Sequence, residues 1–272
     1  MLEKDEYRKE YTKDFVSHWD ELIGWEGREK GENGFFQRLL TAHGIDTVID
    51  VASGTGFHAV TLARDGFEVT AADGSENMLS QTLQNADEHG VEFVDSEVVD
   101  WLELAEAFGP NQFDALICLG NAFTHLFDHE LRRRVLASMY TVLRPGGMIC
   151  LDHRNYDRML DDGYSSKHMY YYTGEGVDAR PVTLHDTLAH FEYTFPDGEK
   201  YQLKLYPLKQ GYVSHLLEDA GFVDITVYGD FERPFEQNDV DFIQQVAFKP
   251  RRPLKNRGTK RGNGANGQSG HA

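Results

Sequence analysis

The sequence predicts an α/β fold built on a mostly parallel, doubly wound sheet, and three observations lead to that prediction. Short apolar runs alternate with stretches of helical periodicity through the middle of the chain. A glycine-rich segment follows the first of these runs and opens a helix. The 272 residues are enough for one large core. Because parallel strands need crossover connections, this alternation favours a series of βαβ units.

The predicted strands and helices alternate after a helical start. Two amphipathic helices are expected first, at about residues 3–22 and 28–42, because aromatic and aliphatic residues recur there at helical spacing. Predicted strands then cover residues 47–51, 67–72, 91–94, 113–119 and 148–152. Predicted helices cover residues 59–65, 76–89, 101–108 and 131–143.

The second half of the chain has a different pattern. Residues 156–209 are rich in Tyr, Phe and Thr and alternate at 187–195 and 200–206, which predicts an antiparallel insertion. A helix at 211–220 and strands at 224–228 and 242–248 are expected to return to the sheet. The expected units are a helical lid (1–45), a cofactor-binding core (46–155), an insertion on the substrate side (156–209), the C-terminal part of the core (210–249) and a disordered basic tail (250–272).

The net charge of −18 is unevenly distributed along the chain. From Lys249 onward there are seven Lys/Arg residues and no Asp or Glu, so the preceding body is more acidic still. Such a surface repels nucleic acid and anionic lipid, and we expect no nucleic-acid and no membrane partner. Two explanations of this acidic charge stay open, adaptation to a high-salt cytoplasm and ordinary acidity.

Compartment and cysteine chemistry are predicted by what the chain lacks. No apolar run approaches the roughly 20 residues of a bilayer span, and residues 1–10 are too charged for a signal peptide, so a cytoplasmic location is expected. Cys118 and Cys150 lie within apolar runs, where a thiol packs as a small hydrophobe. We therefore expect neither a disulfide nor a metal site. A homo-oligomer stays an open alternative.

The glycine-rich segment, residues 48–56 (VIDVASGTG), places a strand before the glycines and a helix after them. In a doubly wound sheet such a loop brings its backbone, here at Ala52 and Gly54, close to a cofactor. The pattern also fits a dinucleotide site or a plain tight turn. Asp50 favours a different ligand, because its carboxylate opposes a pyrophosphate but attracts S-adenosylmethionine, which carries a sulfonium and an ammonium and no phosphate.

Three further strand ends carry residues that suit S-adenosylmethionine. Asp73 ends the second strand, where a carboxylate accepts both ribose hydroxyls; a turn or helix cap is its structural alternative. Asp100-Trp101 follows the third strand and suits the adenine amine and ring, with a buried core tryptophan as the alternative. Leu119-Gly120-Asn121 ends the fourth strand. The carboxyl ends of parallel strands meet at one edge, so the sequence predicts S-adenosylmethionine as cofactor.

Three motifs resemble those of the glycine N-methyltransferase family, most of all its bacterial glycine/sarcosine N-methyltransferases. They are residues 50–56, residues 117–126 (ICLGNAFTHL) and residues 151–157 (LDHRNYD). The first is general to methyltransferases, and the other two are specific. The resemblance runs from about Tyr7 to Lys249. It implies a class I methyltransferase fold, Rossmann-like, with an N-terminal helical lid and an antiparallel β insertion.

The resemblance also implies roles for particular residues. Arg154 is expected to bind the substrate carboxylate with help from Asn121, and Arg28 to hold the carboxylate of the cofactor. The residues expected to line the methyl-transfer site or to cover the cofactor are Tyr11, Trp19, Tyr172 and Tyr193. A surface arginine and packing of the tyrosines in the core are the structural alternatives. His125 either orients the substrate or, as the favoured reading, caps the helix near Asp128.

The function that these features predict is transfer of a methyl group to the nitrogen of glycine, giving sarcosine and then dimethylglycine. An osmolyte pathway toward betaine follows from it as a hypothesis. Such a displacement at a sulfonium needs alignment and a dry site more than a strong general base. The alternatives are an N-methyltransferase of another small amine such as an amino sugar, a non-catalytic S-adenosylmethionine-binding protein, and an NAD-dependent oxidoreductase.

Overall fold

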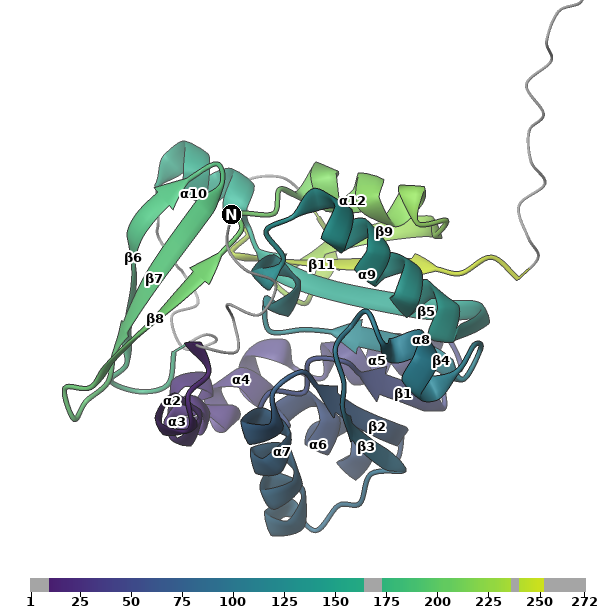
Figure 1. Cartoon of the computed structure of the whole chain (residues 1–272), viewed down its shortest axis with the longest axis horizontal. Coiled ribbons are helices and arrows are strands. Elements are labelled where there is room, and N and C mark those ends of the chain that lie inside the picture. The colour runs from purple at the N-terminus through teal and green to yellow at the C-terminus, as the bar shows by residue number, and fades with distance from the viewer. Residues whose placement is uncertain (1–9, 164–172, 236–239, 252–272) are drawn as a thin grey trace, which may run out of the picture.

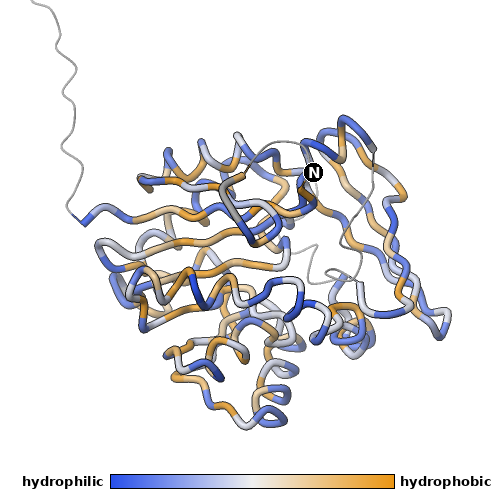
Figure 2. The backbone as a smooth tube through the Cα atoms, turned by 180° about the vertical axis from the view of Figure 1, so that it is seen from behind, coloured by the Kyte–Doolittle hydropathy of each residue, from blue (hydrophilic) through white to orange (hydrophobic). Residues whose placement is uncertain are grey.

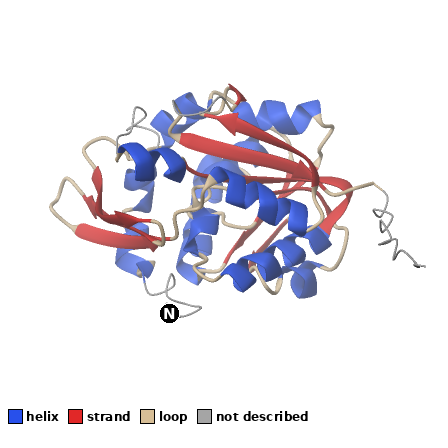
Figure 3. Ribbon diagram, turned by 90° about the horizontal axis from the view of Figure 1, so that it is seen from above, coloured by secondary structure: helices blue, strands red, loops and turns tan. Residues whose placement is uncertain are grey.

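The computed structural model describes residues 10–163, 173–235 and 240–251, which form two separate sheets (Figure 1). The larger sheet has eight strands in the order β10-β9-β11-β5-β4-β1-β2-β3. The smaller has three, in the order β6-β7-β8. Helices cover both faces of the larger sheet, and the smaller sheet projects at one end (Figure 3). The predicted α/β doubly wound class is confirmed.

Five strands of the larger sheet run parallel and carry the predicted βαβ series. Strands β3, β2, β1, β4 and β5 pair in parallel, and β11 pairs antiparallel with both β5 and β9. The bounds are β1 Thr47–Asp50, β2 Glu68–Asp73, β3 Asp95–Val98, β4 Phe113–Cys118, β5 Leu143–Arg154, β9 Val223–Gly229, β10 Arg233–Pro234 and β11 Phe242–Phe248. The central strands are buried on both faces, which explains their continuous apolar runs.

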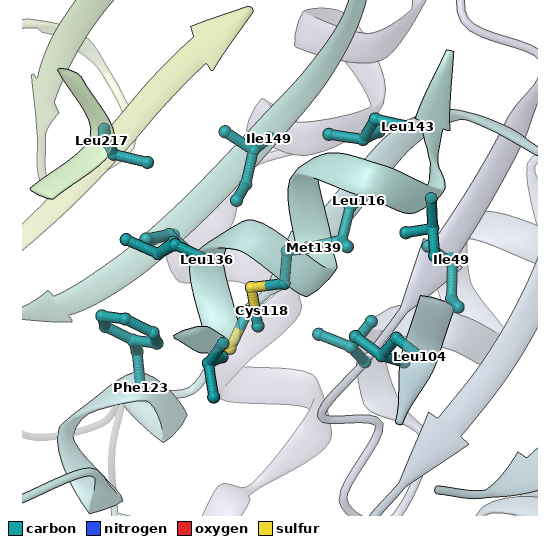
Figure 4. Close-up of a cluster of buried hydrophobic side chains, with 14 of the residues drawn as sticks. Ile49, Leu104, Leu116, Cys118, Phe123, Leu136, Met139, Leu143, Ile149 and Leu217 are labelled. Carbon is teal, nitrogen blue, oxygen red and sulfur yellow. The ribbon is translucent and has the colours of Figure 1, made fainter. Parts of the chain in front are cut away.

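Two hydrophobic cores fill the two faces of this sheet. One lies under α8, α9 and α12 and is centred on Leu116, Leu136 and Met139 (Figure 4). The other lies under α5 and α6. Figure 2 shows the apolar central strands against helices whose outer faces are polar. The helices are α5 Phe35–Ala42, α6 Phe57–Arg64, α7 Glu76–His89, α8 Leu104–Phe108, α9 His129–Val142 and α12 Gln210–Asp219.

The N-terminal region is divided into more helices than its periodicity predicts. The described residues before β1 form α2 Lys13–Ser17, α3 Trp19–Ile23, α4 Trp25–Glu32 and α5, so the prediction of two long helices is wrong. Left-handed backbone at Gly24, Asn33 and Gly34, with φ of 61°, 45° and 67°, separates α3 from α4 and α4 from α5. Helical spacing of apolar residues survives such breaks, and so the pattern concealed them.

Two predictions around the sheet edges are also wrong. The strand expected at 91–94 lies at β3, whose pairing with β2 begins at Asp95 opposite Thr70. Three of the four β3 residues are exposed, so this edge strand lacks the apolar alternation of a half-buried one. Within the segment predicted to be antiparallel, Tyr156–Asp162 forms the helix α10. Its buried residues, Tyr156 and Met159, are three apart, which is too short a pattern to identify a helix.

The smaller sheet packs one face against the N-terminal helices. Its strands are β6 Asp178–His185, β7 Leu188–Thr194 and β8 Lys200–Leu205. Alternate residues of β7 are buried, and Phe15 of α2 stacks on Tyr201 of β8 with ring centroids 4.5 Å apart. His18 Nε2 lies 3.1 Å from a carboxylate oxygen of Asp197 in the β7–β8 turn. Helices α2 and α3 therefore lie against the inner face of this small sheet (Figure 1).

The two cysteines lie in neighbouring central strands. Cys118 ends β4 and Cys150 lies in β5, and both are buried, free thiols. Burial raises the pKa of each thiol well above its usual range, so neither is a reactive thiolate. Across the residues that the structure describes, no helix is long and apolar enough to cross a membrane.

Candidate active site

A large pocket opens at the carboxyl ends of the parallel strands, between the larger sheet, the N-terminal helices and the small sheet. It encloses about 1370 Å³, counting the open solvent at its mouth. The predicted site residues that line it are Tyr11, Trp19, Arg28, Ala52, Gly54, Asp73, Asp100, Trp101, Leu119, Asn121, Arg154 and Tyr193. Asp50 does not line it, and Tyr172 lies outside the described residues. The strand ends thus converge on one space, as a doubly wound sheet requires.

The glycine-rich loop is held so that its backbone faces this pocket. Gly54 and Gly56 have φ of 58° and 100°. A Cβ on Gly56 would lie 3.2 Å from Cα of Thr82, so only glycine fits this turn. The Thr82 hydroxyl donates to the Gly54 carbonyl at 2.8 Å, and the Gly54 N–H donates to Asp73 at 2.9 Å. The loop is therefore fixed from both sides before any ligand binds.

The second and third strand ends place two acids and an indole around the same space. Asp73 accepts the N–H of Gly54 with one carboxylate oxygen and that of Ser75 with the other, at 2.9 and 2.8 Å. Asp100 accepts the N–H of Leu102 at 2.9 Å. The Trp101 indole N–H donates to the Val51 carbonyl at 2.6 Å, which fixes its ring against the loop. The alternative of a fully buried core tryptophan is excluded, because Trp101 is only partly buried and lines the pocket.

Asp50 lies beneath the pocket at the end of β1. Its side chain is 1% exposed, and one oxygen accepts the Ala52 N–H at 3.1 Å. The other oxygen has no hydrogen-bond partner among the described residues. Burial raises the pKa of Asp50 to about 6, against the lowering effect of the nearby His58 charge. An ionised carboxylate here is thus costly unless a positive group comes near.

This shift predicts a pH-dependent gain in stability for Asp50→Asn in the ligand-free protein. The carboxyl titrates near 3.8 when unfolded and near 6 when folded, so its favourable contribution is present below pH 3.8 and is lost as pH rises through 6. At pH 8 the substitution should stabilise the fold by on the order of 3 kcal/mol. Urea unfolding at pH 5 and pH 8 measures this. Asp65→Asn, at an exposed position, is the control and should leave the free energy of unfolding unchanged at both pH values. An equal increase in this free energy at pH 5 and pH 8 for Asp50→Asn would contradict the argument.

The fourth and fifth strand ends bring an amide and a guanidinium together. Asn121 has a left-handed backbone with φ of 66°, and its N–H donates to the buried carboxylate of Asp152 at 2.7 Å. Its side-chain oxygen accepts the Arg154 N–H at 3.1 Å, and its amide donates to the Tyr156 hydroxyl at 2.9 Å. The Arg154 side chain is 4% exposed, with Cζ 5.0 Å from the Phe191 ring centroid. Arg154 is therefore not a surface arginine but a fixed cation in the pocket wall.

The N-terminal segment reaches the pocket through aromatic residues. The Tyr11 hydroxyl hydrogen-bonds to His125 Nε2 at 2.8 Å, and the Tyr11 ring meets Trp19 edge-on at 5.2 Å. Burial lowers the pKa of His125 to about 4, so its imidazole is neutral at physiological pH. His125 lines the pocket, and Asp128 caps α9 by accepting the Leu131 N–H at 2.8 Å. The prediction that His125 caps this helix is therefore wrong.

Several residues of the site carry no role in the sequence analysis. Asp152 and Tyr156 hydrogen-bond to Asn121, and Glu32 lies between Arg28 and His58. Both members of the first pair belong to the segment LDHRNYD, so the motif itself was a signal. No local sequence pattern identifies Glu32 and His58, because their contact joins two different helices, α4 and α6.

The doubly wound sheet, the fixed glycine loop and the pocket at the strand ends define a class I methyltransferase. Residues 48–147 match the family described as a methyltransferase domain. The solved structure of a S-adenosylmethionine-dependent methyltransferase from Clostridium acetobutylicum has a TM-score of 0.66 at 15% identity, over 87% of this chain and 98% of that one. This likeness supports the fold.

Two curated relatives identify the family. The chain is 46% identical to the glycine/sarcosine N-methyltransferase of Aphanothece halophytica over 92% of this chain and 93% of that one. It is 44% identical to that of Halorhodospira halochloris over 92% of each chain. The chain therefore belongs to the glycine/sarcosine N-methyltransferase family, and the similarity covers 249 of its residues.

S-adenosylmethionine is the cofactor of this class, and the pocket fits it. Asp73 and Asp100 line the pocket and Asp50 lies beneath it, so the loop is surrounded by acids that would repel a pyrophosphate. The same acids favour a ligand with two positive groups. Arg28 lines the same pocket and adds a positive group to it.

Proposed function

We propose that this enzyme methylates the nitrogen of glycine to sarcosine and then that of sarcosine to dimethylglycine, with S-adenosylmethionine as donor. The observation that carries the proposal is Arg154, a cation that is 4% exposed at the end of β5 and lines the same pocket as the glycine-rich loop. A buried arginine in a pocket selects a substrate with a carboxylate. The curated relatives are named for glycine and sarcosine, which supports the same choice.

Substrate binding rests on the pair of Arg154 and Asn121. The guanidinium binds a carboxylate with two parallel hydrogen bonds, which fixes the direction of the amine two bonds away. The Asn121 amide, held by Tyr156 and by the Arg154 backbone, keeps the end of β4 in register with the end of β5. The substrate is thereby oriented by groups that are already in place, which reduces the entropy cost of alignment.

Cofactor binding rests on the other strand ends. Asp73 suits the ribose hydroxyls, Trp101 presents a ring fixed by its hydrogen bond to Val51, and Arg28 suits the carboxylate. S-adenosylmethionine supplies a methyl group on a positively charged sulfur. In this placement the methyl group would face Arg154 and Tyr193, which line the same pocket.

The pocket walls promote the reaction by excluding water and by leaving the amine neutral. Tyr11 and Trp19 form one wall with apolar side chains of α3 and β8. An ammonium in a water-poor pocket beside other positive charges loses its proton readily, so no strong general base is needed. His125 is neutral and is already engaged with Tyr11. Room for a second methyl on the nitrogen would let sarcosine react in turn.

We further propose that the enzyme works in the cytoplasm and that its product is the precursor of an osmolyte. Two methyl additions to glycine leave dimethylglycine, one methylation short of betaine. An acidic body is consistent with a cell that accumulates such solutes. Deletion of the gene should lower betaine under salt stress, and unchanged betaine would reject this part of the proposal.

Mass spectrometry of the purified protein with S-adenosylmethionine and glycine tests the activity. We expect sarcosine to appear first and dimethylglycine after it. Sarcosine alone would reject the second step. No product from glycine would overturn the proposal, and the same assay with ethanolamine and an amino sugar then distinguishes another small-amine methyltransferase from a non-catalytic binding protein. Equilibrium binding of S-adenosylhomocysteine against NAD separately tests the cofactor.

A further inference from the structure

A buried ion cluster joins the N-terminal region to the helix that follows the glycine-rich loop. It consists of Arg28 and Glu32 of α4 and His58 of α6, which are 5%, 4% and 8% exposed. Glu32 Oε1 accepts the His58 Nε2–H at 2.8 Å. The same oxygen lies 3.4 Å from Arg28 Nε. Since a carboxylate can only accept, the His58 nitrogen at this contact, Nε2, carries a proton.

The cluster is arranged with its guanidinium toward the pocket. Arg28 lines the pocket, and its Nη2 lies 3.9 Å from the position that a Cβ on Gly120 would take. Its Cζ lies 5.3 Å from the Phe57 ring centroid. Glu32 approaches the guanidinium at Nε, while the Nη end reaches the turn after β4. The guanidinium is thus paired by charge with Glu32 on its Nε side, and its Nη2 lies near the turn after β4.

Glu32 is itself fixed by α6 and not only by its own helix. An i,i+4 pair on one helix is worth little and leaves both side chains several rotamers. The additional bond to His58 removes that freedom, and the His58 ring lies edge-on to Phe36 with centroids 5.2 Å apart. Two charges are costly to bury, so a cluster of this kind is weak evidence for stability and suits a positioning role better.

We propose that Glu32, fixed by His58, is a positioning residue that holds Arg28 in the orientation that receives the carboxylate of the cofactor. The inference rests on the proposed placement of the cofactor, with its amino-acid end at Arg28. A flexible arginine side chain loses rotamer entropy when it is fixed. Glu32 removes that cost before the ligand arrives, which raises affinity without a contact to the ligand.

Two ligands distinguish positioning from a general structural effect. S-adenosylhomocysteine carries the amino-acid carboxylate, and 5′-methylthioadenosine has the same adenosine and sulfur without it. For Glu32→Gln we expect calorimetry to show about tenfold weaker binding of S-adenosylhomocysteine. Binding of 5′-methylthioadenosine should stay within about twofold of wild type. Equal weakening of both ligands, or no change in either, would overturn the proposal.

The chain offers a matched control on the same two helices. Glu29 of α4 is exposed and pairs with Arg64 of α6 at the surface, so Glu29→Gln removes a similar contact between residues that do not line the pocket. Neither ligand should bind it differently. His58→Phe keeps a ring but loses the donor to Glu32, so it should weaken the binding of S-adenosylhomocysteine and not that of 5′-methylthioadenosine. This variant replaces Glu32→Gln if Glu32→Gln does not fold. Unchanged binding by folded His58→Phe would overturn the part assigned to His58.

Arg28→Ala separates failure of this inference from failure of the proposed cofactor placement. If Arg28 binds the carboxylate, this variant loses the preference for S-adenosylhomocysteine over 5′-methylthioadenosine. A variant that retains the preference shows that the amino-acid end lies elsewhere, which rejects the placement. Loss of the preference in Arg28→Ala together with a full preference in Glu32→Gln rejects the role of Glu32 alone.

Discussion

Replacing Arg154 by alanine should lower kcat/KM for glycine by about 30-fold to several thousand-fold, while the affinity for S-adenosylhomocysteine stays near that of wild type. Truncating one partner of a buried, hydrogen-bonded charge pair costs about 2–5 kcal/mol, because the other charge is left without a partner in a dry site. Arg154 is buried, lines the pocket and is held at its backbone by Asn121. Arg154→Lys should retain part of the activity, since it keeps the charge but loses the planar fork.

Steady-state kinetics with glycine and with ethanolamine measure this effect. The wild type should strongly prefer the amine that carries a carboxylate, and Arg154→Ala should lose that preference. Arg133→Ala is a suitable control, because Arg133 is exposed on α9, pairs with Glu130 and does not line the pocket. If Arg154→Ala binds S-adenosylhomocysteine poorly and still prefers glycine, Arg154 serves the cofactor and our assignment is wrong.

Asp73→Ala should weaken the binding of S-adenosylhomocysteine about 100-fold and that of 5′-methylthioadenosine by a similar factor. The carboxylate lines the pocket and accepts the N–H groups of Gly54 and Ser75, so its loss removes a ribose acceptor and loosens the glycine-rich loop at once. Hydrogen bonds to charged groups contribute about 1.5–3 kcal/mol each, which sets this magnitude. The parallel loss of both ligands is the opposite of the pattern expected for Glu32→Gln.

Calorimetry with both ligands measures the effect of Asp73→Ala. Asp95→Ala is its control, because Asp95 begins β3 at the exposed sheet edge and does not line the pocket. Asp73→Asn should fall between wild type and Asp73→Ala, since an amide keeps one acceptor. Should 5′-methylthioadenosine bind Asp73→Ala as tightly as wild type, the carboxylate does not serve the ribose.

The central strands and the site residues at their ends were predictable because both follow from local pattern. A strand buried on both faces, such as β4, appears as a nearly continuous apolar run, here Ala115 to Cys118. In parallel strands every carboxyl end lies at one edge, so Asp73, Asp100 and Asn121 could be assigned to one pocket without coordinates. The glycines between β1 and α6 are also specified locally, by the positive φ of this strand-to-helix turn.

The predicted elements were wrong where the spacing of apolar residues does not reveal the boundaries of the helices and strands. The N-terminal helices keep a helical period across the breaks at Gly24 and Asn33, so the period did not reveal them. Strand β3 lies at an exposed edge and has no core-facing alternation to identify it. His125 follows a strand and precedes an acidic helix start, which suited a cap, but Asp128 performs that function.

By itself, the sequence determined the doubly wound fold, the glycine-rich loop, the edge at which the ligand binds and, by resemblance, the family. Those features depend on periodicity, on glycine conformation and on the direction of parallel strands, which are encoded within short segments. Only the tertiary structure decided that Tyr11 meets His125, that Asp152 and Tyr156 hold Asn121, and that Glu32 joins Arg28 to His58. The residues of these contacts are mostly distant in sequence, and whether buried polar groups meet depends on how whole elements pack, so no local pattern specifies them.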